Sequence, residues 1–226
     1  MTILTLTGWA QPDDALQNLV PGSIAFPYAS MGGPDAAFRE LGKTNPDLLV
    51  GWSLGGALAL QAVAEGRVSP RLLVLIGAPF QFVADEAFKT AMERPVFELF
   101  RQNYTQDPVK TSAKFNKLIC MNDTRSAGIL QILSNNKEAE NSLKWAVWLD
   151  FLSHYSCKKL DFSRFPSILL LHGRGDVIVE VAQTQQFETV LHRVRTETWD
   201  GCGHAPHYHA PDKASSLIYE VMNATI

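Results

Sequence analysis

Ser53 is the residue in this sequence best placed to act as a nucleophile. It lies in the stretch Gly51–Gly56 (GWSLGG), between an apolar run typical of a buried strand and a run of strong helix formers at 57–64. A serine between glycines at such a strand-to-helix turn has the pattern of a nucleophile elbow, which exposes the hydroxyl above the end of a sheet. A Cβ atom at Gly51 or Gly55 would crowd the neighbouring strand and helix. We therefore predict that Ser53 is a catalytic nucleophile.

A serine nucleophile needs a base to take its proton and a carboxylate to orient that base. Asp176 follows the strand-like run Ile168–Leu171 on a glycine-rich loop, and His204 follows the last strand-like run. The order Ser, Asp, His is that of doubly wound hydrolases. Asp200 is the alternative acid, but it lies too near His204 in the sequence to come from a different strand.

Other side chains near these positions compete for the same roles. The setting Gly-x-Gly-His-Ala-Pro favours His204 as the base, and we expect His207 and His209 at the start of the following helix or at the rim. Cys202 is not presented by any elbow, so a packing thiol is the better interpretation. The remaining histidines in the region are His172 and His192.

The intermediate formed by attack on a carbonyl carries a negative charge that must be stabilised. The backbone N–H of Leu54 follows the nucleophile and lies at a helix N-terminus, where the helix dipole favours an anion. A second donor normally comes from the loop after an early strand, and here the backbone N–H of Trp9 is the candidate. The alternative is that Trp9 is only a core aromatic residue.

Strand-like and helical runs alternate along most of the chain, which predicts βαβ units and a mostly parallel, doubly wound sheet of about six strands. The catalytic loops should then lie at the carboxyl ends of the strands. The strand-like runs are Thr2–Thr7, Ser23–Pro27, Leu48–Gly51, Leu72–Ile76, Ile168–Leu171 and Glu197–Trp199, and the helical runs are Pro34–Leu41, Leu54–Glu65, Val179–Val190 and Pro211–Asn223.

The alternation stops at residues 82–160, which have helical patterns only. We interpret this block as a helical cap inserted into a core formed by residues 1–81 and 161–226, although a separate second domain is the alternative. The helical patterns of the cap are Ala87–Tyr104, Pro108–Met121, Ser126–Ser134 and Ser142–Tyr155.

Composition limits the possible partners. A chain of 226 residues with 46% hydrophobic residues fits one globular domain, and a net charge of −3 does not favour nucleic-acid or membrane binding. Three scattered cysteines fit free thiols in a reducing compartment, and no stretch has the character of a signal peptide or a transmembrane helix. We expect a cytoplasmic monomer without a metal or cofactor.

These motifs together resemble the α/β-hydrolase superfamily over nearly the whole chain. Within it, Leu6-Thr7-Gly8-Trp9, the GWSLGG stretch and His204-Ala205-Pro206 resemble the pimeloyl-[acyl-carrier-protein] methyl ester carboxylesterases of biotin synthesis. Two features depart from the usual pattern. Thr7 stands where most relatives have a histidine, and the sequence begins at the first strand, so the expected sheet has a shortened N-terminus.

The resemblance implies a triad of Ser53, Asp176 and His204, with Trp9 and Leu54 donating hydrogen bonds to the oxyanion. The implied reaction is hydrolysis of the methyl ester of pimeloyl carried on acyl-carrier protein. In this family, aromatic residues of the cap contact the acyl chain and basic residues of the cap bind the carrier protein. The matching positions are Phe100 and Tyr104 for the acyl chain, and Arg101, Lys110, Lys114 and Lys117 for the carrier protein.

Plainer interpretations of the cap and of the function stay open at this point. The three lysines can be an ordinary solvated helix face, and the two aromatic residues can be an amphipathic core stripe. The same triad would also serve a thioesterase or a lactonase acting on a small acyl substrate. From a different class, the chain could be a non-catalytic binding protein with a hydrolase fold, although such proteins typically lack a triad residue.

Overall fold

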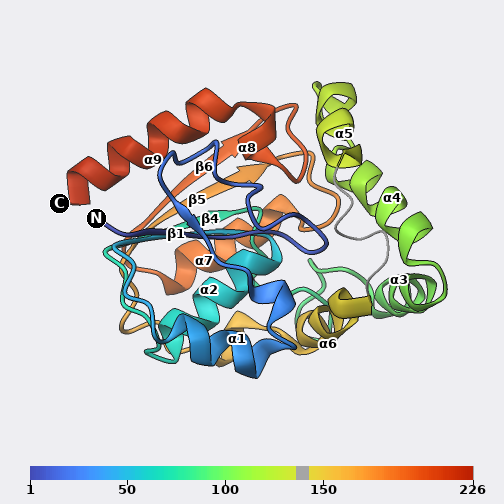
Figure 1. Ribbon diagram of the computed structural model, residues 1–226, viewed down its shortest axis with the longest axis horizontal. Helices are drawn as coiled ribbons and strands as arrows, with labels where there is room; N and C mark the ends of the chain where they lie inside the picture. Colours follow the sequence, from blue (N-terminus) through green and yellow to red (C-terminus); the bar gives the residue numbers. More distant parts are fainter. Residues whose placement is uncertain (136–142, 226) are drawn as a thin grey trace.

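The computed structural model describes residues 1–135 and 143–225 and shows a six-stranded sheet (Figure 1). All neighbouring strands pair in parallel, in the order β2-β1-β3-β4-β5-β6. The predicted parallel sheet of about six strands is therefore confirmed. The strands are β1 (Ile3–Leu6), β2 (Ile24–Ala25), β3 (Leu48–Trp52), β4 (Leu72–Ile76), β5 (Ser167–Gly173) and β6 (Val194–Trp199).

Helices cover both faces of the sheet, which explains why its central strands are apolar throughout. Every residue of β3 and β4 is buried. On one face lie α9 (Pro211–Thr225) and the short α8 (Pro206–His209); on the other lie α1 (Pro34–Leu41), α2 (Leu54–Ala64) and α7 (Thr184–Val190) (Figure 1).

The strand order reverses direction between β1 and β3. The chain passes from β1 to β2 on one side, and β3 then returns to the other side of β1. In open parallel sheets, ligands bind outside the carboxyl ends of the strands at such a switch point. The loop after β1 carries Trp9 and the turn after β3 carries Ser53, so both predicted site residues lie at this position.

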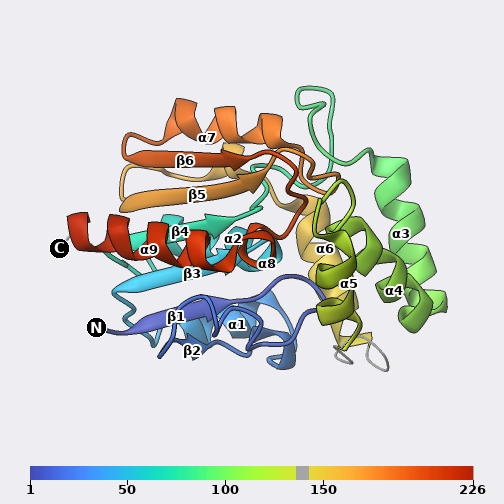
Figure 2. The same ribbon diagram turned by 90° about the horizontal axis from the view of Figure 1, so that it is seen from above.

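Within the part of the chain that the structure describes, four α-helices between β4 and β5 lie beyond the carboxyl ends of the strands (Figure 2). We call them the cap helices: α3 (Arg94–Gln106), α4 (Pro108–Ile119), α5 (Ser126–Ser134) and α6 (Ala146–His154). All four fall within the predicted cap of residues 82–160, whose boundaries as a domain remain a prediction. Residues 136–142 of that cap, including the predicted helix start at Ser142, lie outside the described residues.

Several element boundaries differ from those predicted. Helix α3 begins at Arg94 rather than Ala87, because Pro95 is tolerated only in a first turn and the preceding segment forms the bridges Val83↔Met92 and Asp85↔Phe88. The helical run predicted from Val179 begins as a 3₁₀ turn at Val181–Gln183 and becomes α-helical at Thr184. Among the described residues, no helix is both long and apolar enough to cross a membrane.

Candidate active site

Ser53 is the single residue between β3 and α2, and its backbone has a conformation that L-amino acids rarely adopt. Its φ is 53° and its ψ is −116°, which places it in the strained positive-φ region. Its backbone N–H donates to the carbonyl of Ile76 at 2.8 Å, which ties the turn to the end of β4. This geometry is that of the predicted nucleophile elbow.

The two glycines of the elbow are required by close backbone approach. A Cβ atom at Gly51 would lie 2.6 Å from the carbonyl oxygen of Gly55. A Cβ atom at Gly55 would collide with the carbonyl groups of Leu6 and Thr7 at the end of β1. Because both residues lack a side chain, the first turn of α2 can pack directly against β3 and the end of β1.

Asp176 and His204 form a buried pair on the loops that follow β5 and β6. His204 Nδ1 lies 2.7 Å from Asp176 Oδ2, and Asp176 Oδ1 accepts backbone N–H groups of Ile178 at 2.8 Å and Val179 at 2.9 Å. Burial alone would raise the pKa of Asp176, but His204 and His172 outweigh it, so this pKa is held well below its usual range. Asp176 is therefore an anion that can orient the His204 ring.

A second histidine, His172, also contacts Asp176, although the sequence predicted no role for it. Its Nε2 atom lies 3.2 Å from Asp176 Oδ2 and 2.8 Å from the carbonyl oxygen of Val179. A carbonyl only accepts, so the proton of this imidazole is on Nε2. The sequence signal that could have identified it is the spacing His-Gly-x-x-Asp at the end of a strand.

A hydrogen bond links His204 to the elbow that carries Ser53: the indole Nε1 of Trp52 donates to the carbonyl of His204 at 3.1 Å. The His204 ring also lies against Gly77, directly after β4, where an added Cβ atom would be 3.2 Å from His204 Cε1. Within the described residues, His204 Nε2 is buried and makes no hydrogen bond, so this nitrogen is available to accept a proton.

One predicted oxyanion donor is in the elbow itself, and the other is in the loop after β1. Leu54 is the first residue of α2, so its N–H has no acceptor within the helix. Trp9 is in the loop after β1, and a Cβ atom at the preceding Gly8 would lie 3.2 Å from the Trp52 ring. The positions agree with the predicted roles, which remain proposals.

Trp9 also packs against α3 and α4 of the cap, so its interpretations as an oxyanion donor and as a core aromatic residue are compatible. Its indole Nε1 donates to the carbonyl of Trp145 at 3.0 Å. Its ring makes edge contacts with Phe100, Tyr104 and Phe115 at centroid distances of 5.3, 4.8 and 5.1 Å.

A narrow cavity of about 60 Å³ lies between Ser53 and the cap helices. Phe100, one of the two predicted acyl contacts, lines this cavity, whereas Tyr104, the other, is not among its lining residues and packs edge-on against Trp9. Apart from Ser53, the lining is apolar: Trp9, Phe82, Met92, Val96, Phe100, Phe115, Leu118, Leu149 and Leu152.

The predicted basic residues of the cap fall into two groups. Lys110, Lys114 and Lys117 are exposed on α4, whose opposite side buries Phe115. Arg101 on α3 is already paired with acidic groups of the cap, at 2.9 Å from Glu98 and 2.8 Å from Asp150. The lysines are therefore better placed than Arg101 to meet an external acidic surface.

The residues that were alternatives for the catalytic roles have other partners or surroundings. Asp200 is exposed and pairs with Arg174 at 3.1 Å. Cys202 is buried, and burial raises the pKa of its thiol, which is the opposite of an activated nucleophile. His207 and His209 are both in α8, as expected for the helix start. His207 is buried against Trp52 rather than at the rim, with a ring distance of 4.4 Å.

A model of the alpha/beta hydrolase family matches residues 4–215. The chain belongs to the α/β-hydrolase family. Among solved structures, this α/β hydrolase is similar to an esterase from Exiguobacterium antarcticum, with a TM-score of 0.83 and 14% identity over 99% of this chain and 92% of that one. It is also similar to a bromoperoxidase from Bacillus anthracis, with a TM-score of 0.78 and 17% identity over 97% and 91% of the two chains. At such identities the likeness concerns the fold alone.

Two curated relatives of this α/β hydrolase are named pimeloyl-[acyl-carrier protein] methyl ester esterase. The one from Aromatoleum aromaticum is 29% identical over 199 residues, covering 83% of this chain and 78% of the relative. The one from Xylella fastidiosa is 29% identical over 190 residues, covering 81% and 74%. The predicted class of enzyme, a carboxylic ester hydrolase, agrees with this family and with these names.

Proposed function

We propose that this α/β hydrolase is a serine carboxylesterase with Ser53 as nucleophile, His204 as base and Asp176 as the orienting anion. The observation that carries the proposal is the buried His204–Asp176 pair, which lies beside a strained serine elbow. The loops that carry Asp176 and His204 leave the carboxyl ends of β5 and β6, at the edge of the sheet where this fold binds ligands.

The reaction proceeds through an acyl-enzyme. His204 Nε2 takes the hydroxyl proton as Ser53 Oγ bonds to the ester carbonyl carbon, and the N–H groups of Leu54 and Trp9 stabilise the oxyanion. The bond to the alkoxy group then breaks, and His204 returns the proton to the departing alcohol. A water molecule, deprotonated by His204, attacks the acyl-enzyme and releases the acid and the free serine.

The proposed substrate is the methyl ester of a pimeloyl chain carried on acyl-carrier protein. The support is the name shared by the two relatives, together with an apolar cavity that suits methylene groups. The cavity holds about two water volumes at roughly 30 Å³ each, so a pimeloyl chain requires side-chain movement. Met92 and Phe100 are the adaptable candidates, since neither is fully buried.

The acidic carrier protein would meet the exposed lysines of α4. These lysines lie on the same helix as Phe115 and Leu118, which line the cavity. A carrier protein bound there would present its acyl chain next to the cavity that leads to Ser53. The proposed reaction needs no metal or cofactor.

One substrate molecule tests both the class and the bond that is cleaved. Pimeloyl-[acyl-carrier protein] methyl ester contains a methyl ester and a thioester, so methanol release and thiol release can be measured in the same reaction. We expect methanol and intact pimeloyl-carrier protein. Release of the carrier thiol instead would assign a thioesterase, and preferential hydrolysis of lactones offered in parallel would assign a lactonase.

The Ser53→Ala variant tests the nucleophile. We expect kcat to fall roughly 10⁴-fold or more and labelling by a fluorophosphonate probe to disappear. Ser112→Ala is a matched control, because Ser112 is a buried serine of α4 whose hydroxyl has no partner among the described residues. Absence of probe labelling in the wild-type protein would favour a non-catalytic binding protein.

A further inference from the structure

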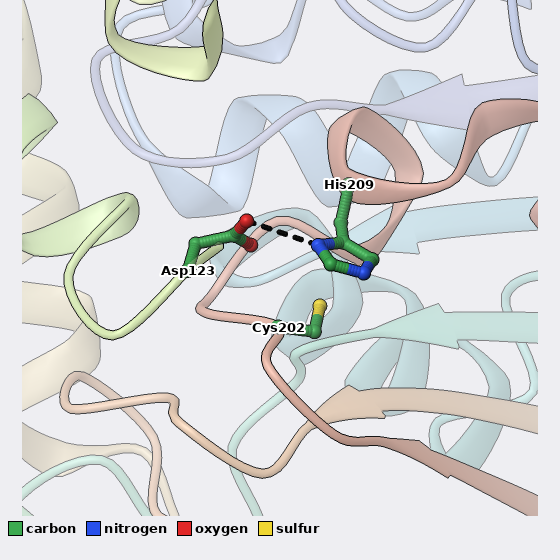
Figure 3. A group of neighbouring side chains, drawn as sticks. All are labelled: Asp123, Cys202 and His209. Atoms are coloured by element: carbon green, nitrogen blue, oxygen red, sulfur yellow. Dashed lines mark hydrogen bonds and ion pairs between the residues drawn. The ribbon is translucent and has the colours of Figure 1, made fainter. Parts of the chain in front are cut away.

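The carboxylate of Asp123 is buried in the loop between α4 and α5, at the junction of the cap helices with the core. Its Oδ1 atom accepts the His209 Nδ1–H at 2.9 Å (Figure 3) and the backbone N–H of Arg125 at 2.7 Å. Its Oδ2 atom accepts the backbone N–H of Gly203 at 2.9 Å. Within the described residues, no lysine or arginine side chain pairs with it. A buried carboxylate is tolerated only when such hydrogen bonds replace water.

Gly203, whose N–H donates to Asp123, immediately precedes His204. Residues of the same cap segment also hydrogen-bond to the residues next to Gly203. The backbone N–H of His204 donates to the carbonyl of Ile119 at 2.9 Å, and the backbone N–H of Thr124 donates to the carbonyl of Gly201 at 2.8 Å. A Cβ atom at Gly203 would lie 2.8 Å from the Ile119 carbonyl oxygen. The loop that carries the proposed base (residues 200–205, the base loop) is therefore attached to the cap at three residues, Gly201, Gly203 and His204.

The loop after β5, which carries Asp176, contacts the same cap segment, residues 119–124. The side-chain Nδ2 of Asn122 donates to the carbonyl of Gly175 at 3.1 Å, one residue before Asp176. Residues 119–124 consequently contact both loops of the acid–base pair. They begin at the last residue of α4, whose Phe115 and Leu118 line the cavity.

We propose that Asp123 is a positioning residue for His204, which it holds in register with Ser53 through the Gly203 N–H. The inference rests on the serine-esterase function proposed above and extends it to a residue of the cap. The base loop contains Gly201 and Gly203, and glycine leaves a backbone free to adopt many conformations. Without the carboxylate, the imidazole would move relative to Ser53, and a displacement of about 1 Å can reduce a rate about 10²-fold.

The hydrogen bonds also weigh against a competing use of the same residues. The carboxylate oxygen of Asp123, the sulfur of Cys202 and a ring nitrogen of His209 lie within 4.8 Å of one another (Figure 3). Atoms of these kinds can bind zinc. However, Oδ1 already accepts two N–H groups and Oδ2 accepts a third, which is the arrangement of a structural hydrogen-bond acceptor.

The test compares Asp123→Ala, Asp123→Asn and Asp107→Asn in the full-length protein. Asp107 is the matched control, because it accepts the backbone N–H of Lys110 at 2.9 Å at the other end of α4 and is not among the acceptors of the base loop. We expect Asp123→Ala to lower kcat for p-nitrophenyl butyrate about 10- to 100-fold, with KM within about twofold. Fluorophosphonate labelling of Ser53 should slow by the same factor, with Asp123→Asn in between and Asp107→Asn at the wild-type rate.

A folded Asp123→Ala variant with wild-type kcat and labelling would overturn the proposal for Asp123 and leave the esterase function intact. The esterase function is tested separately, by the Ser53→Ala variant and by the products of hydrolysis. Should Asp123→Ala not fold, the nearly isosteric Asp123→Asn variant decides by the same two rates. One equivalent of zinc in the purified protein, lost in Cys202→Ser, would also overturn it in favour of a metal site.

Discussion

His204 Nδ1 lies 2.7 Å from Asp176 Oδ2, and neither side chain is more than 1% exposed. The same carboxylate oxygen lies 3.2 Å from His172 Nε2. Two imidazoles and two backbone N–H groups therefore stabilise the charge of Asp176 where water cannot reach it. An ionised Asp176 keeps the proton of His204 on Nδ1 and leaves Nε2 as the acceptor.

Asp176→Asn should lower kcat for p-nitrophenyl butyrate about 10³- to 10⁴-fold, because an amide no longer enforces the reactive tautomer of His204. Steady-state kinetics on protein with wild-type circular dichroism would measure the effect. Asp200→Asn is the control, since Asp200 is exposed and pairs only with Arg174 among the described residues. A larger loss in Asp200→Asn than in Asp176→Asn would make Asp200 the catalytic acid.

Gly55→Ala should destabilise the fold by about 1–3 kcal/mol or more, because the new methyl group collides with the carbonyl groups of Leu6 and Thr7. Urea unfolding would measure the change. Gly128→Ala is the matched control: it lies in α5 with nothing within 4 Å of the added Cβ, so we expect it to stabilise by about 0.5–1 kcal/mol. Equal stabilities for the two variants would contradict the close packing of the elbow on β1.

His207 should make the protein less stable in mild acid. Burial, with a smaller effect of the His204 charge, lowers the pKa of His207 from 6.5 to about 3 in the folded protein. Between these values the unfolded chain binds a proton that the folded chain does not. The stabilisation by His207 is therefore complete above about pH 6.5 and decreases as the pH falls, by up to about 1.4 kcal/mol per pH unit.

The His207→Phe variant should show a flatter dependence of unfolding free energy on pH between 6.5 and 4 than the wild type. The larger ring can extend into the surface cavity of about 530 Å³ that His207 lines. Urea titrations at three pH values would give the slopes. His192→Gln, at an exposed position, serves as the comparison, and an unchanged slope in His207→Phe would show that another group is responsible.

Replacing Lys110, Lys114 and Lys117 together by Glu should slow hydrolysis of the carrier-bound ester about tenfold or more, because the surface would then repel an acidic partner. Hydrolysis of p-nitrophenyl butyrate should not change. The wild-type rate with the carrier substrate should fall as salt rises, and the variant should lose this dependence. Lys43→Glu, two residues beyond the end of α1 and outside the cap, is the control for a lysine-to-glutamate change away from α4. Equal losses on both substrates would place the lysines in folding rather than in binding.

The local pattern around Ser53 was sufficient to predict the elbow, because a strand, a tight turn and a helix follow one another in the sequence. The positions of Asp176 and His204 could be predicted from strand ends, since parallel strands bring their carboxyl ends to one edge. Periodicity was less informative where tertiary contacts set the boundary. The helical run predicted from Val179 begins later, because the backbone of Glu180 is extended, with φ −57° and ψ 133°, and a helix can start only after it.

The sequence by itself thus determined which strand each catalytic loop follows and which residue types meet at the carboxyl edge of the sheet. Only the tertiary structure decided which side chains touch: that Trp9 packs against three aromatic residues of the cap, that His172 joins His204 on Asp176, and that Asp123 binds the N–H of Gly203. The physical reason is distance along the chain. Asp123 and Gly203 are 80 residues apart, and no local periodicity encodes a contact that depends on how a cap loop meets the end of a sheet.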